Sequence, residues 1–281
     1  MRRVSFFRHA DLLHPALGQL GYASTAAAVP DRLGPHDHGS LHEICTIERG
    51  IAHWWVEDEI HHVDAGHCYL TRPGERHGGL GAVFGPFTIR WLVVDLAPRG
   101  VPAWDAAAKR LRELPVRTCP VGATAQDLLA RLLREHQAPG PLAGALVEAL
   151  LVQCFIAIVR DADSAPPQRI SPPIRRALAA IHRRLDTTPT MAALARLAGL
   201  SESGFHRRFR HETGFTPAAY HSHLRVLRAQ DLLRRQEMTV TAIAFELGFP
   251  SSQHFATVFR RVTGMTPTAW RASAASPTRP T

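Results

Sequence analysis

LARLAGLSESGFHRRFRHETGFTP, residues 194–217, and IAFELGFPSSQHFATVFRRVTGMTP, residues 243–267, are two copies of one sequence pattern. Each copy begins with small and apolar residues that end at a glycine, Gly199 or Gly248, and a serine follows shortly after it. Glycine permits the left-handed backbone of a tight turn, and serine caps the helix that comes next. The repeat therefore predicts two helix-turn-helix units in one all-α domain.

The second helix of each copy carries two phenylalanines four residues apart, Phe205 with Phe209 and Phe255 with Phe259. Residues at this spacing share one face of a helix, so the rings face the core and the positions between them face outward. Such a helix fits the major groove, and two of them can occupy successive groove segments about 34 Å apart. The alternative, packed hairpins with a solvated basic face, fits the charge but not the paired turn, cap and ring pattern.

Excess positive charge is confined to the part of the chain that holds the repeat. Residues 174–271 contain 15 Arg and 6 acidic residues, whereas residues 1–173 contain 17 basic and 18 acidic residues. Charge concentrated in one segment indicates a polyanionic partner for that segment. Double-stranded promoter DNA is the partner that this distribution and the repeat predict together.

Residues 174–271 resemble the AraC/XylS family of bacterial regulators, including the closing pattern Gly264-Met265-Thr266-Pro267 and Trp270-Arg271. The resemblance implies a transcription regulator, usually an activator, with RNA polymerase as a partner. Arg207 and Gln253 are the strongest candidate base readers, since Arg pairs with guanine and Gln with adenine. The family's base-contacting positions fall on these residues: Ser203, His206 and Arg207 in the first recognition helix, and Ser252, Gln253, His254 and Thr257 in the second.

Arginines next to these positions are expected to touch phosphates or to bridge helices: Arg208, Arg210, Arg260 and Arg261. Between the two units, residues 217–235 are predicted to form one long helix that fixes the spacing of the two recognition helices. Its apolar residues are expected to pack, and four of its arginines are expected to be exposed: Arg225, Arg228, Arg234 and Arg235.

The first hundred residues read as short alternating segments at 43–47, 52–56, 67–71 and 87–95, broken by Gly, Pro and Asp. This spacing predicts an antiparallel barrel or sandwich. From residue 123 the apolar residues recur every three or four positions, which predicts two antiparallel helices.

Residues 36–38 (His-Asp-His), Glu43 and Gly50 resemble the first cupin motif, and residues 66–77, which end at His77, resemble the second imperfectly. The resemblance implies a small-molecule or metal effector site in which Zn, Fe, Ni or Mn is bound by mixed imidazole and carboxylate ligands. An organic effector without any metal remains an alternative. The implied metal ligands are His36, His38, Glu43 and His77, and no role is assigned to His53, His61, His62 and His67.

The predicted fold class is α+β with several domains. Residues 1–120 form a cupin-like sensing β-barrel and residues 121–160 a helical hairpin for support and homodimerisation. Residues 161–173, rich in Pro, Ser and Asp, form a linker. A double helix-turn-helix domain spans residues 174–271, and a disordered tail spans 272–281.

Cytoplasmic localisation is expected, because the four cysteines lie far apart without a CxxC pair and no secretory leader follows Met1. The most apolar stretch, residues 142–159, contains Glu148 and Gln153 and is marginally short for a bilayer, so it predicts a buried or dimer-forming helix and no membrane contact.

Two other functions stay open. The four cupin residues would serve a metalloenzyme, an oxygenase or isomerase tethered to a DNA-binding domain, with Glu75 and Arg76 as the evident polar neighbours of the metal. A constitutive regulator with a vestigial barrel would bind DNA identically with or without a small molecule. No catalytic residue is predicted for the regulator.

Overall fold

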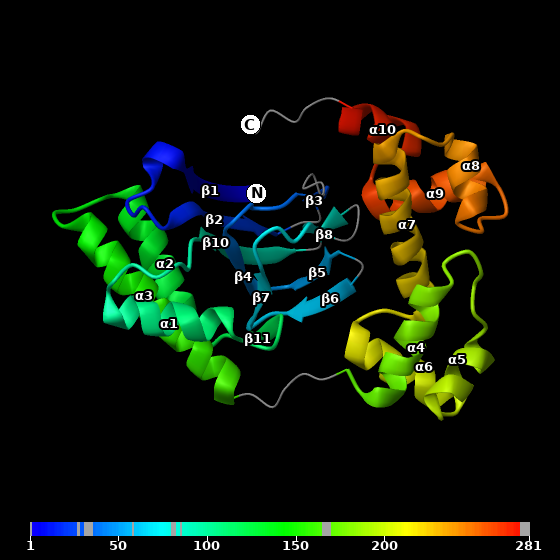
Figure 1. The fold of residues 1–281 in the computed structure, drawn as a ribbon, viewed down its shortest axis with the longest axis horizontal. Helices are drawn as coiled ribbons and strands as arrows, with labels where there is room; N and C mark the ends of the chain where they lie inside the picture. Colours follow the sequence, from blue (N-terminus) through cyan, green and yellow to red (C-terminus); the bar gives the residue numbers. More distant parts are fainter. Residues whose placement is uncertain are drawn as a thin grey trace.

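The computed structural model describes residues 2–26, 29–30, 36–57, 59–79, 83–84, 86–164 and 170–275. The N-terminal part holds the strands and three helices, and the C-terminal part is entirely helical in its described residues (Figure 1). We call them the sensor part, residues up to 164, and the reader part, residues from 170. This two-part layout confirms the predicted sheet-rich N-terminal domain and helical C-terminal domain.

The described strands of the sensor part form a two-stranded pair and two larger antiparallel sheets. A buried cluster that includes Cys45, Tyr69 and Trp54 lies between the two larger sheets. The six-stranded sheet has the order β1 (Arg2–Arg8), β2 (Leu17–Thr25), β10 (Phe87–Val94), β4 (His42–Arg49), β7 (His67–Thr71), β11 (Thr118–Pro120). The three-stranded sheet has the order β6 (Glu59–Asp64), β5 (Ile51–Val56), β8 (His77–Gly79), and β3 (Val29–Pro30) pairs with β9 (Val83–Phe84).

The four strands expected from the sequence are present as β4, β5, β7 and β10, whereas β1, β2 and β6 were not predicted. A short 3-10 helix, His9–Asp11, follows β1. β5 and β6 form a hairpin in which His53 pairs with His62 and Trp55 with Ile60. This hairpin faces the reader part in Figure 1.

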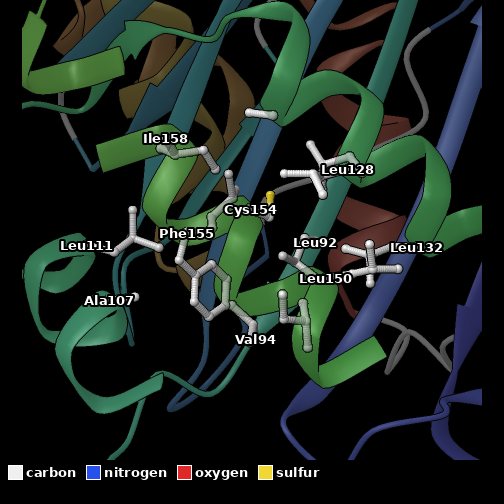
Figure 2. Close-up of a cluster of buried hydrophobic side chains, with 14 of the residues drawn as sticks. Leu92, Val94, Ala107, Leu111, Leu128, Leu132, Leu150, Cys154, Phe155 and Ile158 are labelled. Atoms are coloured by element: carbon white, nitrogen blue, oxygen red, sulfur yellow. The ribbon is translucent and has the colours of Figure 1, made fainter. Parts of the chain in front are cut away.

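Three helices cover the other face of the six-stranded sheet: α1 (Pro102–Arg112), α2 (Ala123–Gln137) and α3 (Ala143–Ser164). Figure 2 shows their apolar side chains meeting the strand β10, with Phe155 of α3 between Leu111 of α1 and Val94 of the strand. The predicted helical pair is present, and α1 is a helix that the sequence did not predict.

The helix α3 is long and apolar enough to cross a membrane, judged by length and composition alone. Core helices of soluble proteins pass the same test, and the residues Val147, Leu151 and Phe155 of α3 are buried against α1 and α2. Because α3 continues to Ser164, the predicted linker at 161–173 begins inside a helix. Residues 165–169 lie outside the described residues.

The reader part contains the two predicted helix-turn-helix units. Ser201 accepts a hydrogen bond from the Gly204 amide, and Ser251 accepts one from the His254 amide, so both serines cap their helices as predicted. The helices are α4 (Pro172–Arg183), α5 (Met191–Ala198), α6 (Glu202–Thr213), α7 (Pro217–Arg235), α8 (Val240–Glu246), α9 (Ser252–Thr263) and α10 (Pro267–Ala275).

Each recognition helix is held by its phenylalanines in a core of its own. Phe205 and Phe209 are buried with α4 and α5, and Phe255 and Phe259 are buried with α8. The long helix α7, predicted at residues 217–235, contributes side chains to both cores. It therefore joins the two units into one body. The predicted disordered tail is helical as far as Ala275, and residues 276–281 lie outside the described residues.

Arg225 contradicts the expectation that this face of α7 is exposed. Its side chain is buried, its Nε donates to the Leu247 carbonyl at 2.6 Å, and its guanidinium lies 3.7 Å from the centre of the Phe249 ring. The turn after α8 leaves a carbonyl without a helical partner, and a guanidinium satisfies it while stacking on an aromatic ring. Helical periodicity alone does not reveal such a partner.

Candidate functional sites

The outward face of α6 carries the first group of predicted base readers. Ser203 and Arg207 are exposed and His206 is half-buried beside them. The rings of Phe205 and Phe209 point into the core from the opposite side, which fixes the rotation of the helix. The predicted positions therefore form one solvent-facing stripe near the N-terminal end of the helix, where recognition helices contact bases.

The helix α9 presents the second group in the same way. Gln253, His254 and Thr257 are exposed, and Ser252 is half-buried. The Thr257 hydroxyl donates to the Gln253 carbonyl at 3.0 Å, so part of its bonding capacity is used inside the helix. The structure places both groups on outer faces, and the individual base contacts remain predictions.

Arg208 lies on a different side of α6 from the readers. Its Nε donates to Glu212 at 2.8 Å, and Glu212 also accepts from the Ser171 amide at 2.7 Å. This arginine therefore ties α6 to the start of α4, which is the bridging alternative that the sequence left open. Arg210, Arg260 and Arg261 are exposed and remain candidates for phosphate contacts.

The four predicted metal ligands meet in the sensor part. His36 and His77 pair across a backbone bridge next to β8, and Glu43 lies on β4 of the facing sheet. The three histidines offer ring nitrogens that all lie within 4.8 Å of one another. Glu43 Oε2 is 3.0 Å from His77 Nε2 and 3.7 Å from His38 Nε2.

The charge of this cluster suits a cation. Burial alone would raise the pKa of Glu43, but hydrogen bonds and charges from His38 and His77 lower it to about 2, so the carboxylate is ionised at neutral pH. The Nδ1 of His77 donates to the Glu75 carbonyl at 2.9 Å, which leaves Nε2 directed at Glu43. A second hydrogen bond that orients a histidine in this way is typical of metal ligands.

Two histidines to which the sequence assigned no role lie against the reader part. The His53 ring centre is 4.3 Å from that of Phe215, and His53 Nε2 lies 2.9 Å from His62 Nδ1. A cavity of about 780 Å³ adjoins this contact, lined by β6, α4, α6 and the start of α7. The sequence gives no signal that the strands β5 and β6, which carry these histidines, lie beside α6, because the contact joins residues more than 150 positions apart.

Two family models match the chain. The AraC-like ligand binding domain matches residues 22–208, which is more than half of the chain, and the helix-turn-helix domain matches residues 194–273. The chain belongs to the AraC/XylS family.

Curated relatives of this AraC-family chain include two transcriptional activators. The activator RhaR of Salmonella dublin is 30% identical over 141 residues, 48% of the chain and 50% of the relative. The activator RhaS of Escherichia fergusonii is 32% identical over 120 residues, 43% of each protein. The chain therefore spans at most about half the length of the curated relatives that it matches.

Among solved structures, the DNA-binding domain of AdpA in complex with a target DNA is 36% identical. It covers 37% of this AraC-family chain and 93% of its own, with a TM-score of 0.34. The two family models overlap at residues 194–208 and therefore do not locate the boundary between the two domains. The domain boundaries given above remain predictions.

Proposed function

We propose that the chain is a sequence-specific DNA-binding transcription regulator whose sensor part binds a small molecule or a metal. The observation that carries this proposal is the pair of recognition helices, α6 and α9, each capped, anchored by phenylalanines and exposed along its reading stripe. The activator names of its relatives support activation. RNA polymerase as a partner and a location in the bacterial cytoplasm are further parts of the proposal.

Arg207→Ala tests base reading. We expect it to weaken binding to a duplex that the wild-type chain selects from a random pool by about 1–3 kcal/mol, because a bidentate contact to guanine is lost. Binding to scrambled DNA should change far less. Arg228→Ala, which removes the same charge from the exposed side of α7, is the matched control. Equal losses on selected and scrambled DNA in a fluorescence anisotropy titration would refute a base-reading role.

The sensor site fits a divalent transition metal in a cupin-like barrel, with His36, His38, His77 and Glu43 as the ligands. Three imidazoles and one ionised carboxylate suit Zn, Fe, Ni or Mn. The histidine nitrogens lie within 4.8 Å of one another, and Glu43 Oε2 lies 3.0 and 3.7 Å from two of them, which is near the spacing that ligands of one ion need. When bound, the metal would supply positive charge that attracts an oxygen atom of an effector. An organic effector alone is the competing proposal.

The metalloenzyme alternative had Glu75 and Arg76 as polar neighbours of the metal, and both side chains are engaged in ion pairs with other residues. Glu75 accepts from both terminal nitrogens of Arg117 at 2.6 and 2.7 Å, and Arg76 pairs with Asp231 of the reader part at 2.9 Å. Groups engaged in this way are not free to move protons at the four-residue cluster. This supports a regulator with no catalytic residue.

Homodimerisation through α3 is part of the proposal. Three large apolar side chains are exposed at its start and along it: Leu142 at 82%, Leu146 at 40% and Ile156 at 36%. The outward side of the neighbouring α2 is polar, with Asp127, Arg131 and Arg134. A narrow apolar stripe beside polar residues is what a second copy of the same helix would cover.

A further inference from the structure

Two free cysteines face each other at one end of the six-stranded sheet. Cys68 of β7 is the direct partner of Cys119 of β11 in the antiparallel register, and their Sγ atoms lie 3.2 Å apart with both thiols free. Backbone hydrogen bonds of 2.8 Å, donated across the strand pair by the Leu70 and Val121 amides, hold the two strands together on either side of the cysteines. β11 is the edge strand next to β7 in this sheet (Figure 1). The fold therefore sets the two sulfur atoms against each other.

This arrangement matches the geometry that a disulfide needs. Residues directly opposite each other on antiparallel strands have Cα atoms about 4.5–5.5 Å apart, and disulfides span Cα separations of about 4.4–6.8 Å. The sulfur atoms of Cys68 and Cys119 need to approach by only about 1 Å to reach a bond length of about 2.0 Å. Bond formation therefore requires rotation of the two side chains and no large movement of the strands.

A metal site explains the cysteine pair less well than a disulfide does. Tetrahedral zinc holds sulfur ligands at about 2.3 Å, which sets them about 3.8 Å apart. Cys154 of α3 packs in the same buried cluster (Figure 2), but burial raises the pKa of its thiol to about 12, so the thiol stays protonated. Among the residues that the structure describes, the three histidines of the sensor site are the only such group whose ligand atoms converge.

The two thiols differ in reactivity. The hydrogen bond from Cys68 lowers the pKa of the Cys119 thiol, and the same hydrogen bond together with burial raises the pKa of the Cys68 thiol. Cys119 is also the more accessible residue, 3% exposed against 0% for Cys68. It lies on a three-residue edge strand whose Thr118 lines the cavity of about 780 Å³. Because the thiolate is the reactive form of cysteine, Cys119 is the sulfur that meets an oxidant first.

We propose that Cys68 and Cys119 are a redox-active pair, a second site of the sensor part at which a peroxide converts two thiols into a disulfide. The Cys119 thiolate attacks one oxygen of hydrogen peroxide and breaks the O–O bond, which leaves a sulfenic acid on Cys119 and releases hydroxide. The hydroxide takes up the proton that Cys119 lost and becomes water. Cys68 then attacks the Cys119 sulfur, the S–S bond forms, and the hydroxyl group leaves with the Cys68 proton as a second water.

Two electrons pass from the sulfur atoms to the peroxide in this reaction. A dithiol reductant returns them by thiol–disulfide exchange, so the modification is reversible. In the reducing cytoplasm proposed for this protein, disulfides are usually transient and serve redox sensing.

Oxidation ties the edge strand β11 to the sheet. β11 leads directly into α2, and the Gly122 amide that precedes α2 donates to Asp161 of α3 at 2.8 Å. The bond also closes a loop that contains β10 and α1, which restricts the unfolded chain. The oxidised protein should therefore melt at least about 4 °C above the reduced protein in scanning calorimetry. Equal melting temperatures of two forms that differ in the disulfide would contradict this effect.

Treatment of the tag-free wild-type chain with hydrogen peroxide, in buffer freed of trace metals, tests the pair. We expect the number of free thiols to fall from four to two, and peptide mass spectrometry to find Cys68 joined to Cys119 in a form that dithiothreitol reverses. The variant Cys45→Ala/Cys154→Ala keeps only the pair and should lose both thiols at a rate within about twofold of wild type. Cys68→Ala should accumulate a sulfenic acid on Cys119 that dimedone traps, whereas Cys119→Ala should leave Cys68 unreacted.

Three results would overturn the proposal: four free thiols after treatment, a disulfide that joins two chains, or oxidation of Cys119 in the wild-type chain that dithiothreitol does not reverse. The wild-type peptide map decides between these outcomes even if a cysteine variant fails to fold. Because the measurement involves no DNA, its failure leaves the proposed DNA-binding function standing, and failure of that function leaves the redox pair standing.

Discussion

Gly248→Ala is expected to destabilise the second helix-turn-helix unit by about 4 kcal/mol, through left-handed strain of about 1–3 kcal/mol and overpacking of a similar size. Gly248 has a φ of +68°, and a Cβ atom on it would overlap the backbone carbonyl of Asp186. Backbone cannot rotate away as a flexible side chain can. Urea unfolding followed by far-UV circular dichroism measures the loss.

Gly199→Ala is the matched control, because Gly199 ends the equivalent helix of the first unit at a φ of +70°. The nearest atom to a Cβ there is the end of the Arg176 side chain at 3.9 Å, so only the left-handed strain of about 1–3 kcal/mol remains. Equal losses at the two glycines would contradict the tight packing of the second turn against the loop after α4.

The second large effect concerns the metal. Tag-free protein should contain about one transition metal ion per chain, and the His36→Ala/His77→Ala variant should contain none. Removal of one hydrogen-bond partner of a metal-binding side chain already weakens metal affinity about 10–100-fold. Removal of two metal-binding side chains should therefore weaken metal affinity by more than that. Elemental mass spectrometry and zinc titration measure content and affinity.

His61→Ala/His67→Ala removes two histidines that lie outside the four-residue cluster and should keep its metal. A chelator should lower the melting temperature of the wild-type protein and leave that of the His36/His77 variant unchanged, because a ligand that binds only the folded state stabilises it. If the wild-type protein contains no metal and zinc does not change its melting temperature, the effector site is purely organic. That result would also exclude the metalloenzyme.

The reader part was predictable because its signals are local. The left-handed glycines, the serine caps and the phenylalanines at four-residue spacing each act within one or two turns, and the repeat shows them twice. The four candidate metal ligands were implied by the resemblance to the cupin motifs, and the structure brings their side chains together. The strand β2 escaped prediction since Gly18 and Gly21 weaken its pattern, and Gly21 is required by the Trp91 ring that packs on it.

Contacts between distant residues were not predictable. The burial of Arg225 depends on the Leu247 carbonyl in the turn after α8, and the contact of His53 with Phe215 joins residues more than 150 positions apart. Surface histidines and exposed arginines are the ordinary expectation when only the periodicity of one element is known. The interface between the two parts is therefore visible only in the structure.

We propose that α6 and α9 read two half-sites on one face of the DNA. The most direct test measures affinity for the selected duplex and for versions with about 5 or 10 base pairs inserted between the half-sites, a half turn or a full turn of the double helix. The half-turn insertion should weaken binding at least tenfold, because α7 fixes the two recognition helices on one side. Unchanged affinity after the half-turn insertion would show that one unit alone reads the site and would refute reading by both recognition helices.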